Sequence, residues 1–293
     1  KSYRDLPVKF AEIGTVYRYE RSGVLHGLFR ARGFTQDDAH IFCSLDQIEK
    51  EVSDVMDLTI EFLNKFGFSD YEIYVSTKPK KYVGSDDEWE SATNSLKKSL
   101  ENKSLKYSID DGGGAFYGPK IDLKIKDVLG RLWQCSTVQV DFNLPKRFDL
   151  EYISSNNQRL QPVMIHRAIF GSFERFFGIL IEHYGGAFPT WLSPYQIRLL
   201  TVSDEQVDFA NEVADNLKSN NLRVYLDLRN EKLGLKIRES EISKVPFIGI
   251  IGNNESENKT INIRRYGGEQ IGEIKIDELV KLICGDTSKE VVS

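Results

Sequence analysis

The sequence has few cysteines and no long apolar run. Its three cysteines, Cys43, Cys135 and Cys284, are an odd number, and no two of them form a C-x-x-C pair. This pattern is typical of a protein of the reducing cytoplasm, where we expect this one to be located. No stretch approaches the ~20 apolar residues of a membrane helix, so we expect no membrane partner. We expect Cys284, within the apolar run LVKLIC, to be buried in a core.

The chain also lacks the basic excess of a general nucleic-acid coat protein. Its 39 basic and 44 acidic residues give a net charge of −5. A protein that covers nucleic acid without specificity is basic, whereas a local RNA-binding face remains compatible with this balance. With 293 residues, 40% of them hydrophobic, the chain is long enough for two globular domains.

Hydrophobic spacing predicts helices and strands in the first part of the chain. Residues 45–66 and 86–101 show helical periodicity, and each segment begins with a capping box, Ser-x-x-Gln or Ser-x-x-Glu. We expect the acidic residues of the first helix, Glu51 among them, to form a solvated face. Strands are predicted at residues 71–76, 105–109, 120–125 and 132–140. Successive strands of this kind favour an antiparallel sheet with helices on one face.

A further helix and a domain boundary follow. The spacing of Ile169, Phe173, Phe176, Phe177 and Leu180 predicts a helix with these side chains facing inward. The run FPTWLSP then places two prolines in a short segment, which indicates a boundary. Beyond it strands and helices alternate, as in a mostly parallel or mixed sheet. We therefore predict an α+β chain with one domain at residues 1–193 and a smaller α/β domain at residues 194–293.

The run VYRYERSGVLHGLFRARGFTQDDAHIFC, residues 16–43, combines arginines with a glycine-punctuated loop. Arginine offers phosphate oxygens a planar fork of donors and stays charged at any relevant pH. Arg18, Glu20 and Arg30 thus suit a nucleoside triphosphate, with the carboxylate accepting from an adenine amino group and Phe34 stacking on the base. The alternative is a β-hairpin with a charged, solvated turn.

A second glycine-rich segment, DDGGGAFYGPK, lies between two predicted strands. It is either a long hairpin loop or a stretch of backbone brought close to a ligand, with Tyr117 and Lys120 facing that ligand. The sequence leaves both interpretations open.

Several runs resemble the bacterial-type threonyl-tRNA synthetases, a family of class IIa aminoacyl-tRNA synthetases. They are VYRYERSG, RGFTQDDAHIFC, GGGAFYGPKIDL, QCSTVQVDFNLP, VMIHRAIFGSFERF, FPTWLSP and DLRNEKLGLKIRE. The first two are similar to motif 2 of class II synthetases, and Gly171-x-x-x-Arg175 is similar to motif 3. The resemblance implies a class II antiparallel sheet with flanking helices, N-terminally incomplete, followed by an anticodon-binding domain. Motif 1 and the editing region of the family would lie before Lys1.

The resemblance also implies roles for residues of the catalytic domain. ATP would be bound by Arg18, Glu20, Arg30, Phe34, Gln134, Thr137 and Arg175. Threonine would be bound by Gln36, Asp38, Tyr117 and Gln139. Arg18, Arg175 and Lys120 would act on the reacting groups, and Mg²⁺ would accompany ATP.

A zinc site is implied in the amino-acid pocket. In the family a cysteine and two histidines hold one zinc, and the histidines match His40 and His166 here. The cysteine is expected upstream of residue 1, because no cysteine precedes Cys43 in this sequence. Without the resemblance, two histidines so far apart in sequence would be ordinary core or surface imidazoles.

The implied reaction joins threonine to tRNA(Thr) through a threonyl-adenylate, with a homodimer expected for the full-length protein. Asn230, Lys232, Glu255 and Arg264 match positions where the family contacts anticodon bases. One alternative is a non-catalytic tRNA-binding or regulatory paralogue, although the motif arginines Arg18 and Arg175 are present. A second is another class IIa synthetase, and a third is that this piece alone is inert.

Overall fold

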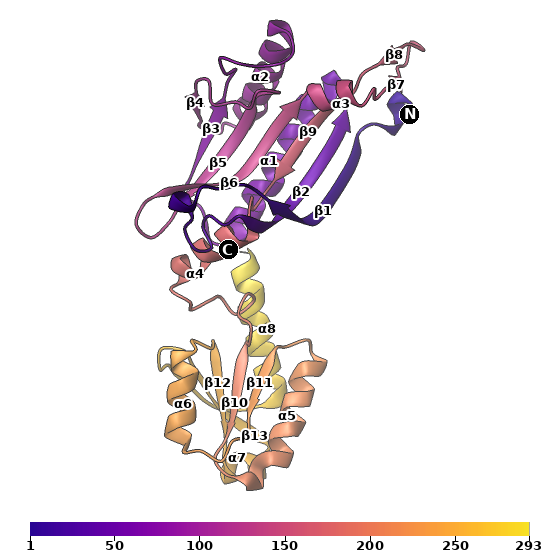
Figure 1. Cartoon of the computed structure of the whole chain (residues 1–293). Coiled ribbons are helices and arrows are strands. Elements are labelled where there is room, and N and C mark those ends of the chain that lie inside the picture. The colour runs from indigo at the N-terminus through magenta and orange to yellow at the C-terminus, as the bar shows by residue number, and fades with distance from the viewer. Residues whose placement is uncertain (293) are drawn as a thin grey trace. The chain divides into compact units, whose positions relative to one another are not determined.

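The computed structural model describes the backbone of residues 1–292 and the side chains of residues 1–287. The chain divides into two compact units, Lys1–Glu182 and His183–Ser293 (Figure 1). The domain boundary predicted between residues 193 and 194 remains a prediction. Among the described residues, no helix combines the length and the apolar character needed to cross a membrane.

The first unit is built on a seven-stranded sheet. Its order is β1 (Val8–Tyr17), β2 (Gly33–Cys43), β9 (Val163–Ala168), β6 (Leu132–Asp141), β5 (Lys120–Lys126), β3 (Tyr71–Ser76) and β4 (Ser108–Asp110). All neighbours are antiparallel except β3 and β4, which are parallel. The predicted antiparallel sheet is therefore confirmed.

Helices α1 (Ile48–Lys65) and α2 (Asp86–Glu101) cover one face of this sheet (Figure 1). Each bears a buried apolar stripe, and Trp89 of α2 is 2% exposed. The predicted capping boxes are present. Gln47 Oε1 accepts from the Ser44 N–H at 3.0 Å. The Ser85 N–H donates to the Glu88 carboxylate, and the Glu88 N–H donates to Ser85 Oγ. The rest of the unit comprises α3 (Asn143–Arg147), the short β7–β8 hairpin (Tyr152–Ile153, Arg159–Leu160) and most of α4 (Phe173–Tyr184).

The second unit is a five-stranded mixed sheet with helices on both faces. The order is β11 (Val224–Asp227), β10 (Ile197–Thr201), β12 (Phe247–Ile251), β13 (Thr260–Arg265) and β14 (Gln270–Lys275). The first three strands are parallel. Helices α5 (Val207–Ser219) and α8 (Ile276–Val292) close an apolar core on one face, α6 (Leu233–Ile242) packs on the other, and α7 (Asn253–Asn258) follows β12.

Several sequence predictions are wrong in detail. The strand predicted at residues 105–109 is the shorter Ser108–Asp110, and strand β1, Val8–Tyr17, was not predicted. Strand β9 was not predicted, because its run VMIHRA lacks clean alternation. Both faces of β9 are buried over most of its length, so its sequence does not alternate between apolar and polar residues.

Three burial predictions are also wrong. Phe177 was expected to face inward, but it is 50% exposed because α4 turns that position away from the core. Cys284 is exposed on α8 rather than buried. Glu51 is not on a solvated face: its side chain is 3% exposed and lies 2.5 Å from Lys9 on β1. Lys9 thus pairs the charge of Glu51 in this buried position.

Candidate active site

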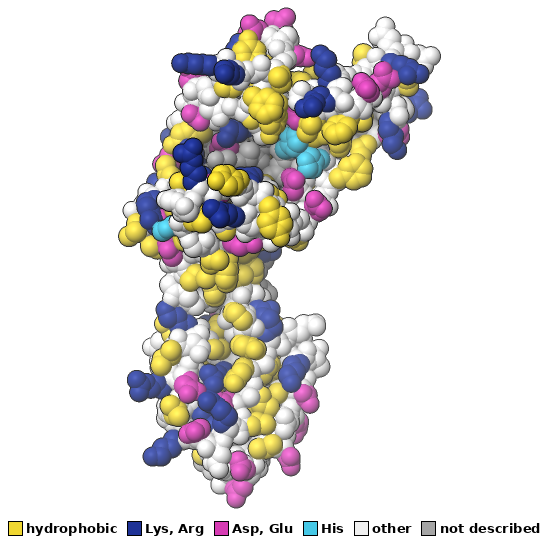
Figure 2. Space-filling model, in the orientation of Figure 1, with side chains coloured by type: hydrophobic (Ala, Val, Ile, Leu, Met, Phe, Trp, Pro, Cys, Tyr) yellow, Lys and Arg dark blue, Asp and Glu magenta, His cyan; other side chains and the backbone are white. Residues whose placement is uncertain are grey.

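The face of the sheet opposite α1 and α2 carries the candidate site. Along β2 the odd-numbered side chains from Asp37 to Cys43 are buried, whereas Phe34, Gln36, Asp38 and His40 are partly accessible. Alternation therefore directs all four predicted residues of this strand to the same open face. Figure 2 shows a hollow in this face, with histidine and basic side chains beside it.

Strand register aligns the predicted residues in two rows across the sheet. His40 of β2 pairs with His166 of β9, which pairs with Gln139 of β6, which pairs with Lys120 of β5. The next row runs Asp38, Ala168, Thr137 and Asp122. Residues that are distant in sequence thus become neighbours on one surface.

One cavity, of about 490 Å³, lies over these rows. All the residues predicted for threonine line it: Gln36, Asp38, Tyr117 and Gln139. Lys120 and His166 line it as well. The Tyr117 hydroxyl donates to Gln139 Oε1 at 3.0 Å, and burial and the nearby Asp141 carboxylate raise the pKa of Tyr117. The tyrosine therefore stays a neutral donor at physiological pH.

A second cavity, of about 360 Å³, lies beside the first. All the residues predicted for ATP line it: Arg18, Glu20, Arg30, Phe34, Gln134, Thr137 and Arg175. Residues that line both cavities are Arg18, Gln36, Gln134, Thr137 and Ala168. The two cavities therefore meet at a boundary that Arg18 occupies.

Aromatic packing and hydrogen bonds fix the loop between β1 and β2 and the motif 3 arginine. Arg175 donates from Nε to Phe29 O at 2.7 Å and from Nη1 to Gln134 O at 2.8 Å. Trp133 stacks with His26, contacts Phe29 and lies under Arg175. Burial, with the nearby charge of Arg30, lowers the pKa of Arg175, but a guanidinium stays protonated. Trp133 was missed by sequence reasoning, because a single tryptophan in a strand reads as core.

Glycines bring backbone segments into close contact beside the cavities. A Cβ at Gly118 would lie 1.7 Å from Val140 O, and one at Gly171 would lie 2.2 Å from Cys135 O. Gly171 also has a φ of +71°. Gly113 and Gly114 line the first cavity, so the segment DDGGGAFYGPK brings its backbone to that cavity.

The two predicted zinc ligands lie together without forming a complete metal site. The ring centroids of His40 and His166 are 4.7 Å apart. His166 Nε2 is 2.9 Å from Asp141 Oδ2, and His40 Nε2 is 3.8 Å from Asp38 Oδ2. Nevertheless, the described residues contain no group of three His, Cys, Asp or Glu side chains placed to hold a metal. These residues alone do not fit the three-ligand zinc site that the resemblance implies.

The predicted anticodon residues do not all lie at one end of the second sheet. Asn230 and Lys232 follow the end of β11, and Glu255 lies in α7 after the end of β12. Arg264 pairs with Ile248 near the start of β12, so it lies toward the opposite end. It faces α6, where its Nε is 3.8 Å from Glu241 Oε1.

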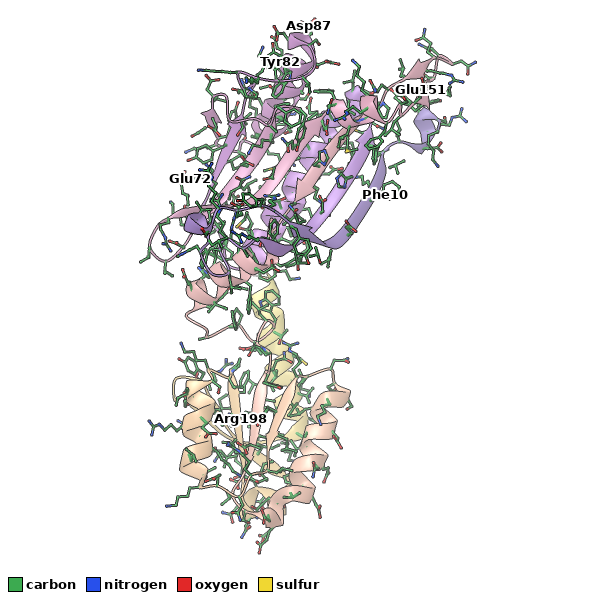
Figure 3. All side chains as sticks on the ribbon, in the orientation of Figure 1. Phe10, Glu72, Tyr82, Asp87, Glu151 and Arg198 are labelled. Carbon is green, nitrogen blue, oxygen red and sulfur yellow. The ribbon has the colours of Figure 1, made fainter. Side chains whose placement is uncertain are left out.

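The second unit also contains a cluster of buried charged side chains around Asp227. Lys236 of α6 is 1% exposed and donates to Thr201 O at 2.9 Å and Asp227 O at 3.3 Å. Asp227 pairs with Arg198, labelled in Figure 3, and with Arg229. Hydrogen bonds from Arg229 and Arg198 hold the pKa of Asp227 well below its usual range. The basic helix of the sequence predicts that Lys236 lies on the surface and holds tRNA phosphate, and this prediction is wrong because the side chain is buried.

Two protein-family models match this chain, one in each of its two units. Residues 1–184 match the tRNA synthetase class II core domain (G, H, P, S and T), and residues 196–284 match the anticodon binding domain. A threonine–tRNA ligase of a Sulfurihydrogenibium species is 54% identical over 293 residues, which are 100% of this chain and 45% of that protein. The chloroplastic/mitochondrial threonine–tRNA ligase 2 of Arabidopsis thaliana is 56% identical over 97% of this chain and 43% of its own length.

Solved structures agree with the sequence relatives. The RNA binding domain of threonyl-tRNA synthetase from Cryptosporidium parvum superposes with a TM-score of 0.90 at 38% identity, covering 97% of this chain and 72% of that one. Prolyl-tRNA synthetase from the same organism, at 18% identity and a TM-score of 0.73, shares the fold. The chain spans under half the length of the curated relatives named above. From sequence identity, domain content and fold together, the chain belongs to the threonyl-tRNA synthetase family.

Proposed function

We propose that the protein containing this chain is a threonine–tRNA ligase that activates threonine with ATP and transfers it to tRNA(Thr). The observation that carries the proposal is the pair of adjoining cavities, one lined by the predicted threonine residues and the other by the predicted ATP residues. An aminoacyl-adenylate joins its two halves through one phosphate. Arg18 lines both cavities, where that phosphate would lie.

In the first step the threonine carboxylate attacks the α-phosphate of ATP and pyrophosphate leaves. Arg18 neutralises the α-phosphate and the attacking carboxylate, and Arg30 and Arg175 hold the outer phosphates. Glu20 accepts from the adenine amino group, and Phe34 stacks on the base. No protein nucleophile is required, so the rate enhancement comes from positioning and charge stabilisation. Mg²⁺ bound to ATP supplies further charge neutralisation when it is present.

Threonine is selected by polar groups around its side chain and amino group. Asp38 accepts from these groups, while Tyr117 and Gln139 close the pocket. Valine lacks the hydroxyl and leaves a buried polar group unpaired, which in such sites reduces the rate by up to ~10⁴–10⁵-fold. Serine lacks only a methyl group, which is worth roughly 1–3 kcal/mol, so serine is discriminated weakly.

Zinc belongs to this proposal as a ligand of the full-length protein. His40 and His166 supply two imidazoles, and a third protein ligand completes the proposed site in the full-length protein. When bound, a zinc ion would act as a Lewis acid toward the amino acid.

In the second step a hydroxyl of the terminal ribose of tRNA(Thr) attacks the threonyl carbonyl, the acyl–phosphate bond breaks, and AMP leaves. Anticodon bases lie in a single-stranded loop, where the edges of the bases are free to form hydrogen bonds with a protein. The residues proposed to contact these bases are Asn230, Lys232, Glu255 and Arg264. A homodimeric state and a cytoplasmic location complete the proposal for the full-length protein.

The test is amino-acid-dependent ATP–pyrophosphate exchange on the full-length protein, with threonine, serine and valine assayed side by side and zinc measured in the same sample. We expect exchange with threonine, weaker exchange with serine and none with valine. Absence of exchange in an intact, zinc-loaded sample would instead support the non-catalytic tRNA-binding or regulatory paralogue.

A further inference from the structure

Asp122 is a buried carboxylate in contact with residues that line the two cavities, and it lies outside the runs that are similar to motifs 2 and 3. It is 2% exposed on β5. Its Oδ2 is 2.6 Å from Lys120 Nζ. Its Oδ1 accepts from Gln134 Nε2 at 2.7 Å and from Thr137 Oγ1 at 2.8 Å. One carboxylate therefore holds three side chains that line the cavities.

A β-bulge makes this arrangement possible. In a regular strand, residues three apart point to opposite faces. The register of β5 and β6 shifts between Leu123 and Lys124, so Asp122 pairs with Thr137 but Lys124 pairs with Gln134. The shift returns Gln134 to the cavity face, where its Nε2 also lies 2.8 Å from Thr137 Oγ1. Bulges re-aim side chains in this way beside active sites.

The chemistry of Asp122 decides which end of the Gln134 amide faces the cavity. An ionised carboxylate only accepts hydrogen bonds, so the amide nitrogen of Gln134 must be turned toward it. The amide nitrogen donates toward Asp122 Oδ1 and Thr137 Oγ1, and because these two oxygens are themselves 2.8 Å apart, one N–H is shared between them. The other end of the amide, Oε1, is an acceptor. The backbone carbonyl of Gln134 also accepts from Arg175, so the same residue helps to hold the motif 3 arginine.

We propose that Asp122 is a positioning residue that fixes Lys120, Thr137 and Gln134 and makes Gln134 present its carbonyl oxygen to a hydrogen-bond donor of the nucleotide. This inference rests on the nucleotide-binding role proposed above for the same cavity. The donor is a ribose hydroxyl or the adenine amino group. A cavity that accepts from such a donor discriminates against nucleotides that lack it.

The test is calorimetric titration of the full-length protein with ATP, 2′-deoxyATP, 3′-deoxyATP and purine riboside triphosphate. We expect the wild-type protein to bind at least one analogue about tenfold more weakly than ATP, as for one lost hydrogen bond. In Asp122→Ala that ratio should fall toward one. The double variant Asp122→Ala with Gln134→Ala should show the same affinity ratio as Asp122→Ala alone, because Asp122 acts through Gln134. The identity of the discriminated analogue shows which donor is read.

A matched control is Glu51→Ala, which removes another buried carboxylate paired with a lysine and lies in α1, on the face of the sheet opposite the cavities. Its analogue ratios should equal those of the wild type. A purely structural role for Asp122 predicts weaker binding of every nucleotide with unchanged ratios, and that result would overturn the proposal. Equal wild-type binding of all four nucleotides would overturn it too.

A second variant and a separate activity assay cover the cases in which the titration alone would not test the proposal. If Asp122→Ala does not fold, Gln134→Ala should itself abolish the analogue preference, and a retained preference refutes the proposal. Exchange with threonine is measured separately on the same samples. A protein without exchange activity whose nucleotide preference depends on Asp122 would contradict the ligase function and support the positioning role.

Discussion

His40 and His166 are register partners on adjacent antiparallel strands, with ring centroids 4.7 Å apart. The Asp141 carboxylate lies 2.9 Å from His166 Nε2, and this hydrogen bond orients the imidazole ring. Two imidazoles are too few for a tight zinc site, since structural and catalytic zinc sites use at least three protein ligands.

The zinc prediction can be checked by metal analysis. We expect the full-length protein to hold about one zinc per chain, and His40→Ala or His166→Ala to lose both the metal and threonine activation. The 293-residue chain alone should bind zinc weakly, because it supplies two of the three ligands. Stoichiometric zinc with normal activation in either variant would remove both histidines from the pocket assignment.

Arg175→Ala is expected to reduce threonine-dependent exchange by roughly 10²–10³-fold, the usual effect of losing one preorganised charge-stabilising donor. Arg175→Lys should restore little, because a lysine cannot bond Phe29 O and Gln134 O together. Steady-state exchange kinetics measure both. Arg159→Ala, which removes a solvent-exposed ion pair with Glu151, is the matched control and should retain wild-type rates.

Gly118→Ala should destabilise the first unit, because the new Cβ would lie 1.7 Å from Val140 O and the loop before β5 must move away from β6. The expected loss is about 1–3 kcal/mol, as for other overpacked sites. Chemical denaturation gives the free energy of unfolding. Gly23→Ala is the control, since no atom lies within 4 Å of its added Cβ. Equal stability of the two variants would show that the loop and β6 can move apart freely.

The hydrogen bonds of Glu174 lead us to expect that the free energy of unfolding decreases in acid. Both of its carboxylate oxygens accept from Thr35 N–H at 2.9 Å, and Ser172 donates to it. Burial raises its pKa, but these bonds outweigh burial and hold the pKa below the ordinary glutamate value of 4.5. The folded state therefore binds fewer protons than the unfolded state. The resulting stabilisation is fully present above pH 4.5 and is lost as the pH falls through the lower, folded-state pKa.

Unfolding free energies of the wild type and Glu174→Gln across the acid range test this. The difference between the two proteins should be largest near neutral pH and should shrink below pH 4.5. A difference that is constant with pH would show that the charge of Glu174 contributes nothing.

Arg264→Ala should weaken aminoacylation of tRNA(Thr) while sparing ATP–pyrophosphate exchange, because Arg264 lies in the second unit and the reacting groups lie in the first. The KM for tRNA and the exchange rate are the two readouts. Lys281→Ala, at an exposed position of α8 on the opposite face of the sheet, should leave both unchanged. Equal losses in exchange and aminoacylation would contradict an anticodon role.

Much of the architecture was predictable because its signals are local. Strand β3 and helix α2 have the predicted bounds, since period-2 and period-3.6 patterns and a capping box act within a few residues. The family resemblance likewise came from short runs. Chemistry-bearing residues such as Arg18 and Arg175 could be named from these runs, although their distances could not.

Only the tertiary structure decided which of these residues meet. The sequence by itself determined that β2 directs Asp38 and His40 to one face, because alternation is a property of the strand. It did not determine that the unpredicted β9 lies beside β2, or that a bulge in the β5–β6 ladder brings Gln134 back to Asp122. Strand order and register depend on packing between distant segments, and a shift of one residue reverses every side chain.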